Sequence, residues 1–251
     1  MQRHLNNTIK KQEQMKTAKN LIILLLLTIV SVHSFAANGY EQSKTRNVKN
    51  FNAIKVSSGI DLYITMGNRE TLKIEADKED IDDVKTEVKN GTLHIYMKRR
   101  NNWFNWGFNE SIKVFVTAKS LEQIDASSGS DVESENTLEG DRLEVEASSG
   151  SDVKLEVYYK TLTLDTSSGC DARIKGKVKT FVAEASSGSD IKAQNLETAI
   201  CKLKASSGSD IDVTVTDEIY AKASSGSDIR YYGNPKIKDT DTSSGGDVHQ
   251  R

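Results

Sequence analysis

The sequence has few of the residues on which most enzymes and disulfide-rich domains depend. Of 251 residues, two are cysteine and four are histidine, and two of the histidines lie in the N-terminal leader. The remaining pair, His94 and His249, gives no Ser-His-Asp arrangement and no metal-ligand spacing. Cys170 and Cys201 stand at different positions of a repeat, which predicts two unpaired thiols. We therefore expect no enzyme, no metal site and no cofactor.

Proline, helical periodicity and blocks of positive charge are scarce as well. The chain has one proline, and its repeats lack the i, i+3, i+4 spacing of an amphipathic helix. Because the leader holds five basic residues and one acidic residue, 29 basic and 35 acidic residues remain after it, a net charge of −6. Without a basic block, no nucleic acid is expected as a partner.

Only one long apolar run is present, from Leu21 to Val32. Lysines precede it and the small-residue stretch 34–37 follows it, which is the pattern of a secretory signal peptide, and the run is short for a membrane span. We expect a start at Met1 or Met15, cleavage after Ala36, and no integral membrane segment after cleavage. The predicted location is the periplasm, the outer cell surface or the medium.

What the chain has in abundance is one short motif. The string Ser-Ser-Gly begins at residues 57, 127, 148, 167, 186, 206, 224 and 243, so the intervals after the first are 21, 19, 19, 20, 18 and 19. An aspartate follows each copy at the same offset: Asp61, Asp131, Asp152, Asp171, Asp190, Asp210, Asp228 and Asp247. Self-similarity at a period near 20 indicates one structural unit stacked on copies of itself.

Apolar and polar residues alternate on both sides of the motif, which is the period of a β-strand. Before the motif the apolar columns are Leu143, Leu162, Phe181, Cys201 and Ile219; Val145, Leu164, Ala183, Leu203 and Ala221; and Ala126, Ala147, Thr166, Ala185, Ala205, Ala223 and Thr242. After it the column is Val132, Val153, Ala172, Ile191, Ile211, Ile229 and Val248. Each repeat is therefore expected to hold two or three short strands that turn these columns inward.

These patterns predict an all-β protein. At about 3.3 Å per residue, 19 residues trace a loop of roughly 60 Å, which suits one coil of a parallel β-helix. A leucine-rich repeat would need a helical limb and its own consensus, and both are missing. The expected fold is a parallel β-helix-like solenoid with about 19-residue coils, preceded by an irregular β region with a hairpin. The predicted domains are a signal peptide (1–36), an N-terminal β region that caps the solenoid (37–120) and the repeat solenoid (121–251).

The repeated motif itself is expected to be a structural corner. Glycine permits a tight bend with positive φ, and serine and aspartate side chains can bond to nearby backbone groups. The alternative is a cation-binding aspartate column, because stacked carboxylates repel one another unless they are separated, hydrogen-bonded or neutralised. One aspartate per coil is too few for a calcium cage of six to eight oxygens, so the structural interpretation is preferred.

The irregular front region holds the candidate site. Residues 88–96 form a hairpin signal around Asn90-Gly91, and Ile112, Val114 and Val116 mark a later strand. Between these strands lie four large aromatic residues, Trp103, Phe104, Trp106 and Phe108. They could plug an open end of the β core, or they could form a ligand-binding platform that stacks on sugar rings.

The order of these features resembles a known family. It comprises a signal peptide, the stretch 51–62 (FNAIKVSSGIDL), the hairpin 88–96 (VKNGTLHIY) and the serial Ser-Ser-Gly-Ser-Asp coils. This combination is similar to the putative auto-transporter adhesin head domain, the head GIN domain, a secreted family of unknown function common in Bacteroidetes. The resemblance covers about residues 40–248, and it implies a β-helix-like fold outside the cytoplasm and supplies no catalytic residues.

A non-catalytic, adhesin-like binding module therefore fits the sequence best, with a glycan or another cell-surface component as the expected partner. The alternatives are a structural cell-envelope protein without a specific ligand and, third, a polysaccharide-processing enzyme on a β-helix. Regular coils leave no long insertion to build a catalytic cleft. Because the last coil leaves unpaired strand edges, a weak homodimer through the C-terminal coil is also expected.

Overall fold

The computed structural model describes residues 42–78, 80–98 and 112–251, and residues 41–251 form one compact unit. The predicted signal peptide lies outside the described residues. In the described part of the chain, no helix is long and apolar enough to cross a membrane.

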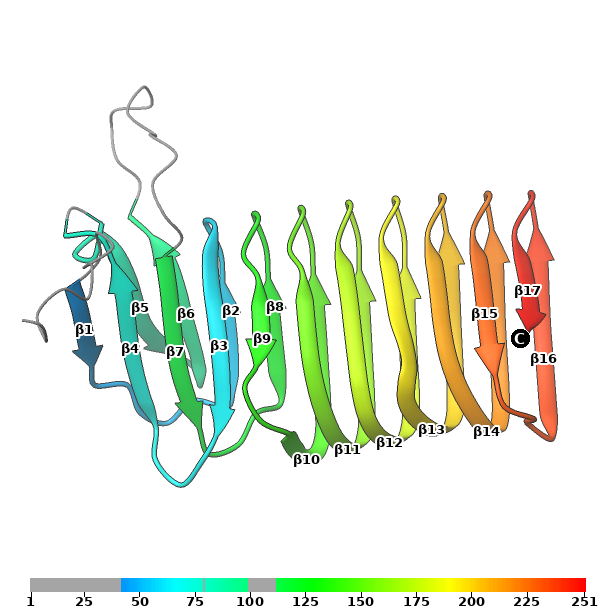
Figure 1. Cartoon of the computed structure of the whole chain (residues 1–251), viewed down its shortest axis with the longest axis horizontal. Helices are drawn as coiled ribbons and strands as arrows, with labels where there is room; N and C mark the ends of the chain where they lie inside the picture. Colours follow the sequence, from blue (N-terminus) through cyan, green and yellow to red (C-terminus); the bar gives the residue numbers. More distant parts are fainter. Residues whose placement is uncertain (1–41, 79, 99–111) are drawn as a thin grey trace, which may run out of the picture. The chain divides into compact units, whose positions relative to one another are not determined.

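The described elements are all β-strands, joined into one continuous hydrogen-bonded sheet (Figure 1). They are β1 (Gln42–Arg46), β2 (Ala53–Val56), β3 (Ile60–Met66), β4 (Thr71–Ala76), β5 (Val84–Lys89), β6 (Thr92–Met97), β7 (Ile112–Ala118), β8 (Gln123–Ala126), β9 (Val132–Ser134), β10 (Leu138–Ala147), β11 (Val153–Thr166), β12 (Asp171–Ala185), β13 (Asp190–Ser206), β14 (Asp210–Ser224), β15 (Asp228–Tyr232), β16 (Ile237–Ser243) and β17 (Asp247–Gln250). The predicted all-β solenoid is confirmed.

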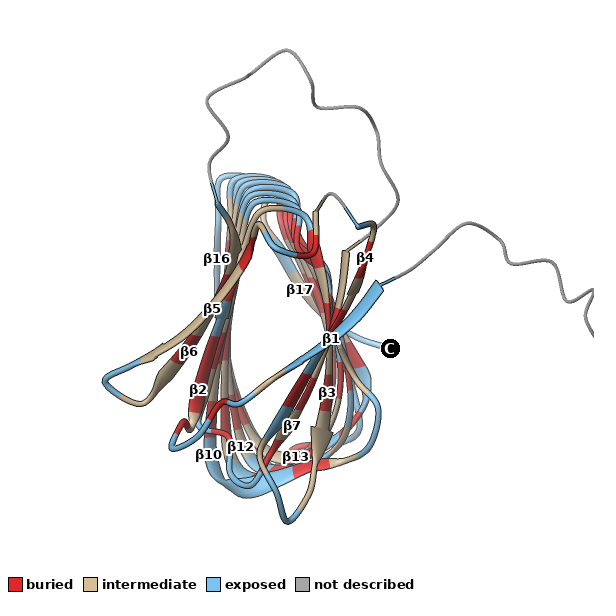
Figure 2. Ribbon diagram, turned by 90° about the vertical axis from the view of Figure 1, so that its left-hand side faces the viewer, coloured by how far each residue is buried: buried red, intermediate tan, exposed pale blue. Residues whose placement is uncertain are grey.

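Each regular coil has two walls, which face one another across the apolar core (Figure 2). The Ser-Ser-Gly corner joins the walls at one edge, and a bend within each of the long strands β11 to β14 joins them at the other (Figure 1). Neighbouring coils pair in parallel and in register, so that Asp190 lies beside Asp210 and Ala185 beside Ala205. Equivalent residues of successive repeats therefore form ladders along the stack.

The predicted inward columns form the core. Leu162, Phe181 and Cys201, which are register partners in three successive coils, are all fully buried. The last coil differs, because β16 is exposed along its whole length and Thr242, predicted to face inward, is exposed. At the inward positions of this coil, polar residues such as Lys238 and Thr240 take the place of the apolar ones. The apolar columns before the motif therefore end one coil earlier, whereas Val248 of β17 still packs against the core.

The irregular front region joins the same stack. The coil of β2 and β3 lies between β8 and β9 on one side and β6 and β7 on the other, with parallel pairing throughout. Beyond β7, the strands β4 and β1 continue the sheet in antiparallel fashion, and the hairpin of β5 and β6 turns at Asn90 and Gly91, both with positive φ. The predicted hairpin is confirmed. Because β2 pairs with β8, the hydrogen bonding runs across the predicted boundary at residue 120.

Candidate functional site

The Ser-Ser-Gly corner is a tight turn with two consecutive residues in the left-handed region. Ser187 has φ 57° and Gly188 has φ 69°, and the equivalent pairs in the other coils have similar values. A Cβ added to Gly188 would meet nothing within 4 Å, so glycine is needed there for its conformation rather than for space. Both residues therefore have the left-handed backbone conformation, which glycine adopts readily and serine rarely.

The third serine of the motif is buried and serves the backbone. Ser209 Oγ lies 2.8 Å from the carbonyl of Ala185 in the preceding coil and 2.8 Å from the carbonyl of Ser206 in its own turn, and it accepts a bond from the Ser206 amide. Ser189 makes the equivalent three contacts, and Ser227 makes the equivalent bonds to the Ala205 carbonyl and from the Ser224 amide. These serines add buried side-chain hydrogen bonds that link the corners of successive coils.

Cys170 stands at this serine position in one coil, where it is fully buried and unpaired. A thiol is a weak donor, so Cys170→Ser is expected to restore the ladder bonds and to raise the free energy of unfolding by about 1 kcal/mol. Urea denaturation measures the change. Cys201→Ser is the matched control: Cys201 lies in the inward column beside Phe181 and Ile219, and a buried hydroxyl there is expected to be destabilising. Loss of stability in both variants would contradict the serine ladder.

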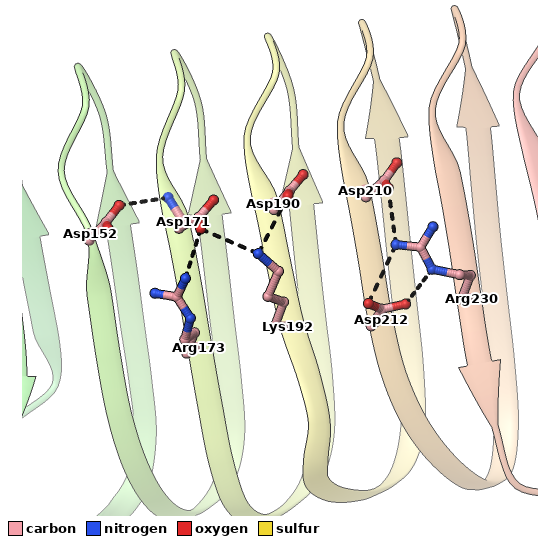
Figure 3. Close-up of polar contacts among 8 residues, drawn as sticks. All are labelled: Asp152, Asp171, Arg173, Asp190, Lys192, Asp210, Asp212 and Arg230. Carbon is pink, nitrogen blue, oxygen red and sulfur yellow. Dashed lines mark hydrogen bonds and ion pairs between the residues drawn. The ribbon is translucent and has the colours of Figure 1, made fainter.

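The aspartates of the motif bond from coil to coil. Asp131 Oδ1 accepts from the Asp152 amide at 3.1 Å, and Asp152 Oδ1 accepts from the Asp171 amide at 3.0 Å. Figure 3 shows the second of these contacts together with the later coils. A carboxylate that accepts a backbone N–H bond is stabilised in its charged form. Hydrogen bonding therefore accounts for part of the stability of the column.

Basic residues two positions after the aspartates neutralise the later coils (Figure 3). Lys192 lies 3.3 Å from Asp171 and 3.6 Å from Asp190. Arg230 Nε lies 2.6 Å from Asp212, and its Nη2 lies 3.0 Å from Asp210. The hydrogen bond to Asp212 is the largest cause of a raised Arg230 pKa, with burial opposing it. The described residues contain no group of three or more His, Cys, Asp or Glu side chains placed to hold a metal ion.

The wall that precedes each Ser-Ser-Gly corner, opposite the wall with the motif aspartates, carries a stripe in which carboxylates outnumber the lysines paired with them. Asp125, Glu146, Asp165 and Glu184 are register partners in four successive coils, with Lys55 paired to the first and Lys204 to the last. Burial, followed by the charge of Asp125, raises the pKa of Glu146 above its ordinary value of 4.5. Burial, followed by the charge of Glu184, raises the pKa of Asp165.

This stripe predicts a pH-dependent gain of stability in Glu146→Gln. Because its pKa is raised in the folded state, Glu146 contributes stability below the unfolded pKa and loses that contribution as the pH rises through the folded pKa. At neutral pH the variant should melt at a higher temperature than the wild type, and the difference should shrink towards zero below pH 4.5. Glu139→Gln, which removes the same charge at the bend, is the control. An equal gain in both variants would contradict the stripe.

A groove of about 690 Å³ lies along the bends of β10 to β14. Three rows of residues cross the coils there. Tyr159, Val178 and Thr198 form the middle row and are buried. The row before it contains Glu139, Tyr158, Lys177 and Glu197, and the row after it contains Asp141, Lys160 and Lys179; all of these residues are exposed.

The groove combines an aromatic ring with balanced charges. Tyr158 is 60% exposed, the largest exposed fraction among the described large hydrophobic side chains. Lys160 pairs with Asp141 at 2.7 Å and Lys177 with Glu197 at 2.6 Å. Beneath them, Tyr159 donates to the Leu121 carbonyl at 2.9 Å, and burial raises the Tyr159 pKa above its ordinary value. The result is a shallow, polar-rimmed surface rather than an enclosed catalytic pocket.

A second, smaller hollow of about 230 Å³ lies near Tyr63, on the wall that carries the motif aspartates. The Tyr63 ring stacks on Phe115, with centroids 5.0 Å apart, and Lys73 Nζ lies 4.5 Å from the Phe115 centroid. Burial first, and then nearby carboxylates such as Asp61 and Glu133, raise the Tyr63 pKa. Tyr63, Phe115 and Lys73 therefore pack against one another on the outer surface of the sheet, and this packing accounts for their arrangement.

The predicted site residues Trp103, Phe104, Trp106 and Phe108 lie outside the described residues, so their role stays a prediction. The strands on either side of them are placed. β6 pairs with β2 and β7 pairs with β3, and the Ser57-Ser58-Gly59 corner joins β2 to β3. β6 therefore lies beside β2 on one wall, and β7 lies beside β3 on the other.

Sequence reasoning missed the groove at the bend. A signal was present, because Glu139, Tyr158, Lys177 and Glu197 follow one another at intervals of 19, 19 and 20. The corner string is nearly identical in every repeat and so marks the period clearly, whereas these residues differ in type from coil to coil. Tyr158, an aromatic residue at a position where the strand alternation points outward, is the feature that could have indicated the groove.

Several solved structures share this fold, including the following three. A protein from Bacteroides fragilis NCTC 9343, named a putative adhesin, is 21% identical, with a TM-score of 0.79 over 85% of this chain and 98% of that one. A putative lipid binding protein from Parabacteroides distasonis ATCC 8503 is 20% identical, with a TM-score of 0.68 over 85% and 98%. A putative adhesin from Parabacteroides merdae ATCC 43184 is 18% identical, with a TM-score of 0.68 over 85% and 97%.

A search of curated proteins finds no match. The family described as "Putative auto-transporter adhesin, head GIN domain" matches residues 50–235, which is most of the chain. This span begins just before β2 and ends between β15 and β16, so it covers both the irregular front coils and the regular repeats. The resemblance drawn from the sequence is thus confirmed, and the chain belongs to the head GIN domain family.

Proposed function

We propose that this protein is a non-catalytic binding module outside the cytoplasm that recognises glycan or other cell-envelope material. The observation that carries the proposal is the groove along the bends, where an exposed tyrosine lies among paired lysines and carboxylates. Aromatic rings with nearby polar groups are typical of ligand-binding surfaces. The family, which is named for adhesion, supports the same class of function and suggests a protein at the cell surface.

The chemistry of the described surface favours binding over catalysis. The motif aspartates accept backbone bonds or pair with Lys192 and Arg230, so they are engaged in holding the coils together. A glycosidase would need two carboxylates placed on either side of a scissile bond, one of them with a raised pKa. Glu146 and Asp165 have raised pKa values, but they lie side by side on a flat wall rather than in the groove.

Lipid is included among the materials to be tested, because one neighbour is named a putative lipid binding protein. Here the space between the walls is filled by apolar columns such as Leu143, Leu162 and Phe181. A lipid would therefore have to bind on the outside of the coils.

The test is a binding screen of the exported protein against a glycan array, purified envelope polysaccharides and phospholipid vesicles. Saturable binding to one or more glycans, with no change in the glycan's chain length, supports the proposal. Shortened chains would indicate a polysaccharide-processing enzyme. If the protein binds neither glycans, nor envelope polysaccharides, nor vesicles, the result would indicate a structural envelope protein without a specific ligand. The variant Trp103→Ala/Trp106→Ala, run in the same screen, tests the predicted aromatic platform.

We also propose a weak homodimer through the C-terminal coil. β16 pairs only with β14, and β17 only with β15, among the described strands, so each leaves one edge unpaired. The polar side chains of β16 weaken this contact, because Asp239 and Asp241 would face one another in an antiparallel pair centred on Thr240. Light scattering over a range of concentrations should show a small rise in mass. A constant monomer mass would contradict the dimer.

A further inference from the structure

The groove at the bends has a periodicity that an extended polymer can follow. Its rims consist of one residue per coil, and successive coils are about 4.8 Å apart. Glu139, Tyr158, Lys177 and Glu197 occupy four consecutive coils in register, so this rim is on the order of 15 Å long. The repeat of an extended, linear hexose chain is similar to this spacing, so successive sugars could meet successive coils.

The charge of the groove argues against a strongly charged ligand. Its lining includes three lysines, Lys160, Lys177 and Lys179, and three carboxylates, Glu139, Asp141 and Glu197. Two of the lysines already pair with carboxylates across the coils. An acidic polysaccharide would be attracted by the lysines and repelled by the carboxylates, and a cationic peptide would experience the reverse.

Neutral hydroxyl groups fit this lining better. Lysine ammonium groups donate and carboxylates accept hydrogen bonds, so both rims can bond to hydroxyls without a change in net charge. Tyr158, in the second of the four coils, presents a ring that is 60% exposed for stacking on a sugar face. The depth of the groove is limited by the buried row of Tyr159, Val178 and Thr198, which suits a flat chain.

We infer that the groove along the bends of β10 to β13 binds a neutral, linear polysaccharide whose axis follows the stack of coils, with Tyr158 as its aromatic platform. This inference rests on the proposed binding function and names the ligand class and the site. The bends lie within the long strands, at the edge of the stack opposite the Ser-Ser-Gly corners (Figure 1). The corner face is therefore left free of the bound chain.

The test is calorimetry of the exported protein with cello-, manno- and laminari-oligosaccharides of two to six sugars, and with oligogalacturonate as the acidic probe. For at least one neutral series, affinity should rise with length and level off once the chain spans the four coils. Tyr158→Ala should lower the affinity for the hexasaccharide at least about tenfold. Tyr232→Ala is the matched control, because among the described tyrosines Tyr232 is the other exposed one, at 37%, and it does not line the groove.

The outcomes separate this inference from the broader proposal. Binding of oligogalacturonate in preference to every neutral chain, or neutral binding that Tyr158→Ala leaves unchanged, overturns the groove assignment while a glycan-binding function stands. If neither a glycan nor any other envelope material of the screen binds, the proposed function fails and the inference with it. Binding to phospholipid alone overturns the inference only. Circular dichroism and melting of both tyrosine variants show that each loss arises in a folded protein.

Discussion

Replacing Leu203 with aspartate is expected to remove most of the protein's stability. Leu203 is 4% exposed, in the inward column between its register partners Ala183 and Ala221. A carboxylate at this position would have no partner in the apolar column and would have to be buried charged or protonated. The expected loss in the free energy of unfolding is roughly 4 kcal/mol or more, against a total of about 5–15 kcal/mol for a typical domain. Urea denaturation followed by circular dichroism measures it.

The matched control for this variant is Lys202→Asp. Lys202 is the preceding residue of β13 and is exposed on the outer side of the same wall. The control introduces the same side chain one strand position away, where water solvates it, so a change within about 0.5 kcal/mol is expected. Equal losses in the two variants would mean that β13 does not alternate between the core and the solvent.

Replacing Gly176 with alanine is expected to have the second largest effect. Gly176 has φ 118°, and an added Cβ would lie 2.1 Å from the backbone carbonyl oxygen of Val157 in the neighbouring coil. Val157 is the register partner of Gly176 in a continuous parallel ladder, so its carbonyl cannot move without breaking that ladder. We expect a loss of roughly 3–5 kcal/mol in the free energy of unfolding from the clash together with backbone strain.

Gly188→Ala separates the clash from the strain. Gly188 also has a positive φ, 69°, but nothing lies within 4 Å of the position of its Cβ. Only the conformational cost of about 1 kcal/mol is expected there. If the two alanine variants lost equal stability by urea denaturation, the close approach of β11 and β12 at the bend would be contradicted.

The regular coils could be predicted because a strand's period of two and a repeat of about 19 residues reinforce one another. Phe181 and Ile211 occupy columns whose other members are also apolar, and both are fully buried. The turn could be predicted because Gly188 and its equivalents require positive φ. The exposure of the last coil could not be predicted, because Thr242 continues a column in which another threonine, Thr166, is buried.

The order of the front coils could not be obtained from spacing. β8 follows β7 in the chain but pairs with β2, more than 60 residues earlier, because the intervening segment inserts a coil on the far side of β2 and β3. Partner choice among parallel strands depends on such long-range packing. The groove at the bends was not predicted, although Tyr158 and Lys177 stand one repeat apart and are register partners of β11 and β12, because the residues that line it differ in type from coil to coil.

The claim that the stacked coils build a binding groove at their bends is tested most directly by a crystal structure of the exported protein with a neutral hexasaccharide from the calorimetric panel. The sugar chain should run across β10 to β13, with one ring stacked on Tyr158 and hydroxyls bonded to groups such as Lys177 and Asp141. A chain bound instead to the Tyr63 wall, or at the Ser-Ser-Gly corners, would contradict this account of the site.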